Sequence, residues 1–345
     1  MAPKKKSGLL NLEDIARLSG VSRSTVSRVI NNSPNVREET RQRVLKVIAE
    51  HNFAPNLAAR SLVTQRTRVI GLYIPYFVSA LFSDPYFPML IQAITARANE
   101  LDYDVMLWLR GQNTPPTHLH QRVLENRMTD GLILASTARD DTLMDELIER
   151  GRVYVLNGRP WRHADQANYV DTANREGAQQ AVEHLAQLGR RRIATITGRV
   201  DISSGYDRLL GYQDVLARLG LPQEEALVYY GDFTEHSGYL GVHKLMSAEP
   251  DAIFVASDRM ALGALRALRE LGVRVPDDVA LVGFDDMPFA TLAEPQLTTI
   301  RQSVPRLGTL AVEGLIGLLE GTITPPYQAV LPTQLVIRAS CGFPH

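Results

Sequence analysis

The chain has 345 residues, of which 45% are hydrophobic and 22% charged, and its net charge is −1. These values are ordinary for a globular protein of two or three domains, and no run of about 18 apolar residues exists that could cross a membrane. The single cysteine, Cys341, excludes an internal disulfide framework and fits a reducing cytoplasm, where we expect the protein to act. Residues 1–10 have a basic start but no apolar segment behind it, so we expect a flexible basic arm rather than a secretory signal.

The small net charge conceals an asymmetry along the chain. Residues 1–68 hold 13 lysines and arginines against 5 aspartates and glutamates, a net charge of +8. Residues 69–345 hold 24 against 33, a net charge of −9. A basic head on an acidic body favours contact of the head with nucleic acid. A solubilising tail is the alternative, but such a tail would lack the apolar stripes of the helices predicted next.

Residues 12–31 predict a helix-turn-helix. Asn11 and Asp14 have nearly the spacing of a capping box, so a first helix begins there. Gly20 ends that helix, because glycine tolerates the positive φ of a tight turn, and Ser22 is suited to cap a second helix. The apolar residues of the second helix fall on one face, which we expect to be buried: Val26, Val29 and Ile30.

The opposite face of the second helix carries only guanidinium and hydroxyl groups, from Arg23, Ser24, Ser27 and Arg28. An arginine side chain can bond O6 and N7 of guanine together, and the amides of a helix start attract a phosphate. This face therefore suits DNA. In isolation, an ordinary amphipathic helix with a solvated face would show the same pattern.

Residues 35–50 predict a third helix, with Glu38 and Glu39 favourably placed at its start. Its inward residues are expected to be Val44, Leu45 and Ile48. This helix would complete a three-helix DNA-binding domain over residues 11–55.

The segment PNLAARSL, residues 55–62, is prone to form a helix of about two turns. An isolated helix in water needs roughly 12 to 15 residues, so this segment should fold only when something docks it. We assign residues 56–67 to a hinge helix and linker.

From residue 68 to residue 340 the pattern changes to short apolar runs between amphipathic helices. We expect strands in seven segments: RVIGLYIP, YDVMLWL, GLILAST, VYVLNG, RRIATITG, AIFVASD and VALVGFDD. Helices are expected in PMLIQAITARANELD, TLMDELIERG, EGAQQAVEHLAQLG and DRMALGALRALRELG. Such alternation predicts parallel sheets covered on both faces, and the run divides near Asn168 into two halves.

Ligands of open α/β sheets bind beyond the carboxyl ends of strands, so polar and aromatic residues that follow a strand are candidates for a binding site. Carboxylates and a guanidinium bond the hydroxyls of a sugar, and aromatic rings cover the apolar face of its ring. Each residue also has a plainer explanation, such as a helix cap for Asp258 or a core position for Tyr86. The candidates are Asp84, Tyr86, Phe87, Asn157, Arg159, Ser257, Asp258 and Asp285.

Catalytic motifs are not found in the sequence. It has no G-x-x-x-x-G-K-[ST] phosphate loop, no G-x-G-x-x-G after a strand and no G-x-S-x-G elbow. His118 and His120 form the only close histidine pair, and no further metal ligands cluster with them. We therefore expect no enzyme activity, no metal and no cofactor.

The chain resembles the lactose-repressor family of bacterial transcription regulators along essentially its whole length. The segments that carry the resemblance include EDIARLSGVSRSTVSRVINN, YVDTANREGAQQAVEHLAQLGRRRIATITG and SDRMALGALRALRELGVRVPDDVALVGFDD. It implies an all-α helix-turn-helix domain followed by an α/β sensor domain of two subdomains, like a type I periplasmic sugar-binding protein. The expected subdomains are an N-subdomain at about 68–167 and 301–328, and a C-subdomain at about 168–300 and 329–340.

The resemblance also implies roles for single residues. Arg23, Ser24 and Arg28 would read base edges in the major groove. Phosphate contacts are implied for Ser22, Thr25, Ser27, Asn31 and Thr40. The hinge segment, with Asn56, Ala59, Arg60 and Leu62, would pair with its dimer mate in the minor groove, where Leu62 would wedge between the central base pairs. Arg208 and Phe233 would join the ligand site by their positions.

The favoured function is a transcriptional repressor that binds double-stranded, pseudo-palindromic operator DNA as a homodimer. A small-molecule effector, a mono- or disaccharide, would control its affinity for DNA, and no membrane is involved. A solute-binding protein for a transporter is a second reading, which residues 11–62 oppose because such a protein would not need them. An architectural DNA-binding protein with a vestigial sensor is the third.

Overall fold

The computed structural model describes residues 10–30, 33–51, 53, 66–77, 81, 83–111 and 115–343. The chain forms two compact units, residues 1–67 and residues 68–345. Each unit has hydrophobic clusters of its own.

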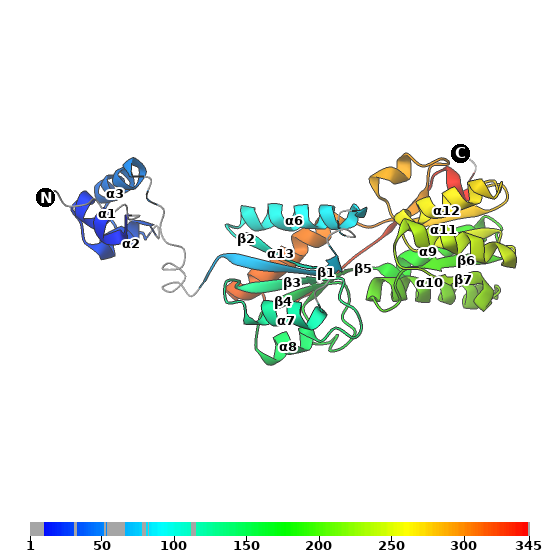
Figure 1. Ribbon diagram of the computed structural model, residues 1–345, viewed down its shortest axis with the longest axis horizontal. Coiled ribbons are helices and arrows are strands. Elements are labelled where there is room, and N and C mark those ends of the chain that lie inside the picture. Colours follow the sequence, from blue (N-terminus) through cyan, green and yellow to red (C-terminus); the bar gives the residue numbers. More distant parts are fainter. Residues whose placement is uncertain are drawn as a thin grey trace. The chain divides into compact units, whose positions relative to one another are not determined.

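In its described residues, the N-terminal unit contains three helices (Figure 1): α1 (Leu12–Ser19), α2 (Arg23–Ile30) and α3 (Glu38–Glu50). Asn11 and Asp14 form the expected capping box. Oδ1 of Asn11 accepts a hydrogen bond from the amide of Asp14 at 3.0 Å, and the carboxylate of Asp14 accepts one from the amide of Asn11 at 3.1 Å. Gly20 has a φ of 67° after α1, and Oγ of Ser22 accepts from the amide of Thr25 at 3.2 Å. The predicted turn and both predicted caps are confirmed.

A small apolar cluster holds these helices together: Ile15, Ala16, Val26, Val29, Val44 and Phe53. On α3, Val47 and Ile48 pack against this cluster at positions i+3 and i+4 from Val44. The side chain of Leu45 is 42% exposed, so the prediction that it faces inward is wrong. The reason is the helical period: residue i+1 lies about 100° round the helix from Val44, outside the stripe that i, i+3 and i+4 define.

The larger unit contains two six-stranded sheets. The first sheet is parallel throughout, in the order β11-β5-β4-β3-β1-β2. Its strands are β1 (Val69–Phe77), β2 (Asp104–Arg110), β3 (Gly131–Ala135), β4 (Tyr154–Asn157), β5 (Tyr169–Thr172) and β11 (Gln328–Leu331). The second sheet has the order β12-β10-β9-β8-β6-β7, in which β12 runs antiparallel to β10. Its strands are β6 (Ile193–Thr197), β7 (Val228–Tyr230), β8 (Ala252–Val255), β9 (Ala280–Asp285), β10 (Thr298–Arg301) and β12 (Gln334–Val336).

Helices cover both faces of each sheet (Figure 1). On the first sheet, α6 (Tyr86–Glu100) and α13 (Val304–Glu320) pack on one face, and α7 (Pro116–Glu125) and α8 (Leu143–Glu149) on the other. On the second sheet, the pair α9 (Asn174–Gln187) and α10 (Ser203–Leu219) lies opposite the pair α11 (Glu235–Leu245) and α12 (Asp258–Glu270). Because helices bury both faces of the central strands, these strands are nearly continuous apolar runs, which is typical of parallel sheets. The seven predicted strands and four predicted helices are all present.

The chain crosses between the two sheets three times. The first crossing follows Thr172 and not Asn168, because β5 pairs with β4 and β11 and so belongs to the first sheet. The second lies between Arg301 and Val304. The third follows Leu331 at the end of β11, slightly beyond the predicted boundary at residue 328. The two α/β halves are therefore as expected, with boundaries moved by a few residues.

Candidate functional site

The N-terminal unit presents its polar face on α2. Ser22, Arg23, Ser24 and Arg28 are exposed there, while Val26 and Val29 on the opposite face are buried. Thr25 and Ser27 are half-buried on the same helix, and Thr40 lies in the first turn of α3. The remaining predicted DNA contacts lie outside the described residues: Asn31, Asn56, Ala59, Arg60 and Leu62.

One acidic residue approaches this face from the neighbouring helix. Nη1 of Arg23 lies 3.4 Å from Oε1 of Glu13 on α1, and both side chains are well exposed, at 66% and 70%. An ion pair this exposed contributes little to stability, so Arg23 is free to exchange Glu13 for another partner.

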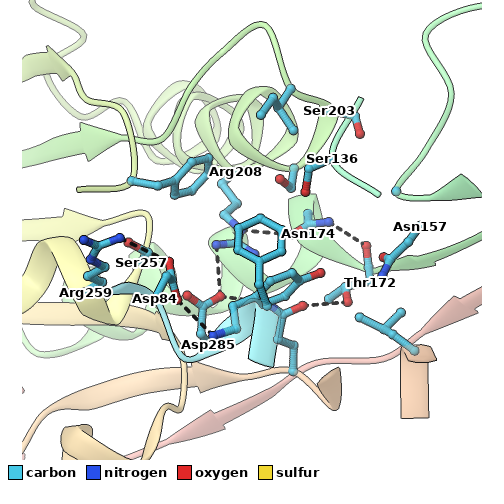
Figure 2. A pocket seen from close by; sticks show the side chains of 18 of the residues that line it. Asp84, Ser136, Asn157, Thr172, Asn174, Ser203, Arg208, Ser257, Arg259 and Asp285 are labelled. Atoms are coloured by element: carbon cyan, nitrogen blue, oxygen red, sulfur yellow. Dashed lines mark hydrogen bonds and ion pairs between the residues drawn. The ribbon is translucent and has the colours of Figure 1, made fainter. Parts of the chain in front are cut away.

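A pocket opens where the carboxyl ends of strands from both sheets meet (Figure 2). It holds about 110 Å³ of free space, whereas a single water needs only about 10–15 Å³ on this measure, so the pocket has room for a small organic ligand. Eight of the ten predicted ligand residues line it: Asp84, Tyr86, Phe87, Asn157, Arg208, Phe233, Ser257 and Asp285.

Arg208, on α10, organises one wall of the pocket. Its Nε donates to Oδ1 of Asn174 at 2.9 Å, and its Nη1 donates to the carbonyl of Ala256 at 2.6 Å and to Oδ1 of Asp285 at 3.2 Å. The guanidinium also lies 3.6 Å from the ring centroid of Phe284. These contacts leave the side chain 5% exposed and hold the guanidinium in one place.

Three of the carboxyl groups that line the pocket have pKa values raised chiefly by burial: Asp84, Asp171 and Asp285. Burial raises the pKa of Asp285 to about 6, while Arg208 opposes the shift. Burial likewise raises the pKa of Asp171, at the end of β5, to about 7, and the nearby carboxylate of Asp207 adds to the rise. Burial penalises the charged form of a carboxyl group. A ligand that donates hydrogen bonds to these groups would therefore stabilise their charged form.

Asn157 supplies a donor that lacks a partner. It is the last residue of β4 and is 8% exposed, and its Nδ2 is buried without a hydrogen-bond partner. Figure 2 shows this side chain on a different wall from Arg208. A buried N–H without an acceptor is costly, so a ligand that brings an acceptor to Asn157 gains the corresponding free energy.

Aromatic rings form the apolar part of the lining. The ring centroid of Phe87 lies 5.0 Å from that of Tyr76 and 5.3 Å from that of Tyr86. Phe233 reaches the pocket from the segment after β7 with a φ of 70°, a conformation that is uncommon outside glycine. Its ring sits over Gly198, where a β-carbon would lie 2.0 Å from Cζ of Phe233. Glycine at position 198 therefore makes room for the ring.

The structure places two predicted ligand residues outside the lining. Arg159 instead donates to Asp207 through Nε at 2.9 Å and through Nη2 at 2.7 Å. Asp258 is fully buried, where it accepts from the amide of Met287 at 2.8 Å and from Oγ1 of Thr299 at 2.5 Å. In both cases a nearby donor or acceptor in the protein turns the side chain away from the pocket.

Several lining residues are not among the predictions. Asn174 and Gln302 lie at the crossings between the sheets, and Nε2 of Gln302 donates to Oδ1 of Asp285 at 2.6 Å. Arg259 immediately follows the predicted pair Ser257 and Asp258. The others with polar side chains are Tyr76, Ser136, Thr137, Asp171, Thr172, Ser203, Ser204, Asp232 and Thr234. These residues lie at the end of a strand, just after one or at the start of a helix, so the same positional signal applies to them as to the predicted residues.

One ion pair spans the pocket between the two halves. Arg259 lies in the first turn of α12, which packs on the second sheet, and Asp84 precedes α6, which packs on the first. Nη1 of Arg259 lies 3.9 Å from Oδ2 of Asp84, and its Nη2 donates to Oγ of Ser83 at 2.9 Å. The pair therefore connects the walls that a bound ligand would touch.

In the described part of the chain, no helix has the length and apolar character that a bilayer crossing requires. The same residues include no group of three or more histidine, cysteine, aspartate or glutamate side chains that could hold a metal ion.

Comparison with known proteins finds matches to both units. Residues 11–56 match the family described as bacterial regulatory proteins, lacI family, and residues 182–341 match the periplasmic binding protein-like domain. The HTH-type transcriptional regulator CelR of Thermobifida fusca is 40% identical over 335 residues, which cover 95% of this chain and 97% of that protein. The ribose operon repressor of Haemophilus influenzae is 30% identical over 335 residues, which cover 96% and 98%.

Solved structures give the same result. A transcriptional regulator CelR–cellobiose complex superimposes with a TM-score of 0.76 at 37% identity, covering 96% of this chain and 99% of that one. The lac repressor dimer bound to operator and the anti-inducer ONPF superimposes with a TM-score of 0.85 at 29% identity, covering 97% and 99%. The likeness thus extends over nearly the whole chain.

Proposed function

Because the chain belongs to the lacI family of bacterial regulatory proteins, we propose that it is a transcriptional repressor whose affinity for operator DNA is controlled by a small ligand. The members of this family are transcriptional regulators and not enzymes. We place the protein in the cytoplasm, where its DNA is accessible.

The helix α2 is proposed to enter the major groove of the operator. Arg23, Ser24 and Arg28 would read base edges, because their side chains are exposed on the polar face. Phosphate contacts are proposed for Ser22, Thr25, Ser27, Asn31 and Thr40. Two copies of the chain would bind as a homodimer, so the operator would have matching twofold symmetry.

The hinge segment is proposed to bind the minor groove next to the operator's centre. Leu62 would insert between base pairs and kink the duplex, which costs a few kcal/mol and is offset by wider contact. Asn56, Ala59 and Arg60 would line the groove. Since a two-turn helix is unstable alone, its formation can be made to depend on the sensor.

The effector is proposed to be a sugar bound in the pocket between the two halves of the sensor. The observation that carries this proposal is the unpartnered buried Nδ2 of Asn157, in a pocket that carboxyl groups and aromatic rings also line. Sugar hydroxyls both accept and donate, so one ligand can satisfy Asn157 and the carboxyl groups together. Cellobiose is the first compound to try, because the CelR structure is a cellobiose complex.

Effector binding is proposed to change the separation of the two halves of the sensor. This movement would in turn change the spacing of the paired hinge segments over the minor groove. A coupling of about 1–3 kcal/mol would change operator affinity by about 5- to 150-fold. By linkage, operator DNA would change effector affinity by the same factor.

The test is fluorescence anisotropy with a duplex selected from a random pool, titrated with and without cellobiose, glucose and ribose. We expect strong preference for a symmetrical duplex and a change in its affinity with at least one sugar. If the protein prefers no duplex over random sequence, the proposal that it is a sequence-specific regulator is wrong. Sequence-specific binding that no small solute alters would indicate a vestigial sensor.

A further inference from the structure

The charged groups that line the pocket are unequal in number. Among the described residues, four carboxyl groups line it, from Asp84, Asp171, Asp232 and Asp285, against two guanidinium groups and no lysine or histidine. The pocket therefore carries an excess of acidic groups in a confined space. A ligand with a negative charge would enter a region where like charges already repel each other.

Both guanidinium groups are already bound to carboxylates of the same pocket. Arg208 is held by Asp285, Asn174 and the carbonyl of Ala256, and Arg259 lies beside Asp84 and donates to Ser83. An anionic ligand would have to share the charge of either guanidinium with a largely buried carboxylate that already lies beside it. The negative charges of the ligand and of that carboxylate would then repel each other at short range.

The lining is instead rich in acceptors for a ligand's hydroxyl groups. Carboxylate oxygens accept only, and a hydroxyl group can donate to them, whereas a ligand carboxylate or phosphate oxygen offers no proton at neutral pH. The raised pKa values of Asp171 and Asp285 agree with a site where additional negative charge is disfavoured. The unpartnered Nδ2 of Asn157 needs only a neutral acceptor, which a hydroxyl oxygen supplies.

We infer that the pocket selects uncharged, hydroxyl-rich ligands and discriminates against sugar acids and sugar phosphates of the same size. This inference rests on the proposed carbohydrate function of the pocket and adds the charge class of the effector. The discrimination is produced by committing both arginines to internal carboxylates.

The first experiment is isothermal titration calorimetry of the full chain at pH 7.5 with matched ligands. Glucose, galactose and cellobiose are compared with the acids in which a carboxylate replaces the hydroxymethyl group, and glucose also with glucose 6-phosphate. Like-charge contact costs several kcal/mol, so we expect each anion to bind at least about 100-fold more weakly than its neutral partner. An anion that binds within about tenfold of its partner, or more tightly, overturns the inference and leaves the sugar site intact. If no member of any pair binds and no sugar in the anisotropy titration alters operator affinity, the proposed sugar function itself is wrong.

The second experiment frees one arginine. In Asp84→Asn, Arg259 loses its carboxylate while Oδ1 remains to accept from the amide of Tyr86, a bond of 3.0 Å in the native chain. The affinity for the uronic acid should rise several-fold relative to the neutral sugar. The matched control is Glu235→Gln, which frees Arg266 from a similar pair of 2.8 Å that does not line the pocket, and should leave this ratio unchanged. An unchanged ratio in Asp84→Asn, or an equal change in both variants, would contradict the inference.

Discussion

Nη1 of Arg208 lies 3.2 Å from Oδ1 of Asp285, and the two side chains are only 5% and 10% exposed. Asp285 ends β9 with a φ of 117°, and the following residue, Asp286, also has a positive φ of 58°. Backbone strain of this kind is retained where surrounding contacts hold it, and Gln302 adds a second donor to the carboxylate. The ion pair is therefore a rigid part of the pocket wall and not a mobile surface contact.

The first prediction concerns Asp285→Asn. The amide keeps an acceptor for Arg208 and Gln302 but removes the charge, and hydrogen bonds to charged groups are worth about 1.5–3 kcal/mol, so effector affinity should fall at least about tenfold. Calorimetry with the sugar that binds the native chain measures this loss, and operator affinity without effector should be retained. The control is Asp286→Asn, since Asp286 bonds Arg301 and Arg338 and does not line the pocket. A normal ligand response in Asp285→Asn would place the effector elsewhere.

The second prediction concerns Arg28→Ala on the exposed face of α2. Loss of a base-reading arginine should cost about 1–3 kcal/mol of operator affinity and relax the preference for one base pair. Anisotropy with the selected duplex and its single-base variants gives both quantities. Lys46→Ala, on α3, removes an equal charge from a side chain 76% exposed and should leave the base preference unchanged. Equal effects of the two substitutions would show that Arg28 acts only through its positive charge and does not read a base.

The third prediction concerns Leu62→Ala in the hinge segment. Without the wedge the duplex loses its kink and part of its contact, so operator affinity should drop while effector affinity remains nearly intact. Anisotropy and calorimetry on one preparation separate the two, with Val63→Ala as the neighbouring apolar control. Equal operator binding by the Leu62 variant and the parent would refute the wedge.

The fourth prediction is a pH dependence that Asp171 produces. Its folded pKa of about 7 lies above the ordinary value of 3.8, so the folded protein holds the proton more tightly than the unfolded chain. Its contribution to the free energy of unfolding is thus fully present below about pH 4 and is lost as pH rises through about 7. In urea unfolding between pH 5 and 8, the stability of the native chain relative to Asp171→Asn should fall with rising pH. If this difference in the free energy of unfolding stays constant or rises between pH 5 and 8, Asp171 is ionised over the whole range.

The fifth prediction concerns Gly198→Ala. The added methyl group would lie 2.0 Å from Cζ of Phe233, so the ring has to leave its position beside the pocket. Effector affinity should fall, while operator binding in the absence of effector should persist because the N-terminal unit is a separate compact unit. Retained effector affinity would mean that the ring of Phe233 does not contact the ligand.

The sequence by itself determined the helix-turn-helix and the central strands. The caps at Asn11 and Ser22 and the turn at Gly20 depend on residues within a few positions of one another, so local spacing is enough to predict them. The seven predicted strands are continuous apolar runs because helices cover both faces of their sheets. Leu45 differs from the prediction because it lies one residue beyond Val44, outside the apolar stripe that Val44, Val47 and Ile48 form on α3.

Tertiary structure decided the short strands and the direction of the pocket's side chains. β5, β7, β10, β11 and β12 have only three or four residues each and, unlike the equally short but fully buried β4 and β8, contain exposed or partly exposed residues, so they give no continuous apolar run and depend on pairing with distant strands. Position after a strand correctly placed Asn157 and Asp285 at the pocket. The same rule failed for Arg159, which turns to Asp207 on α10, and for Asp258, which turns inward to Thr299. A side chain's direction is set by the partner it finds, and these partners lie 48 and 41 residues away in the chain.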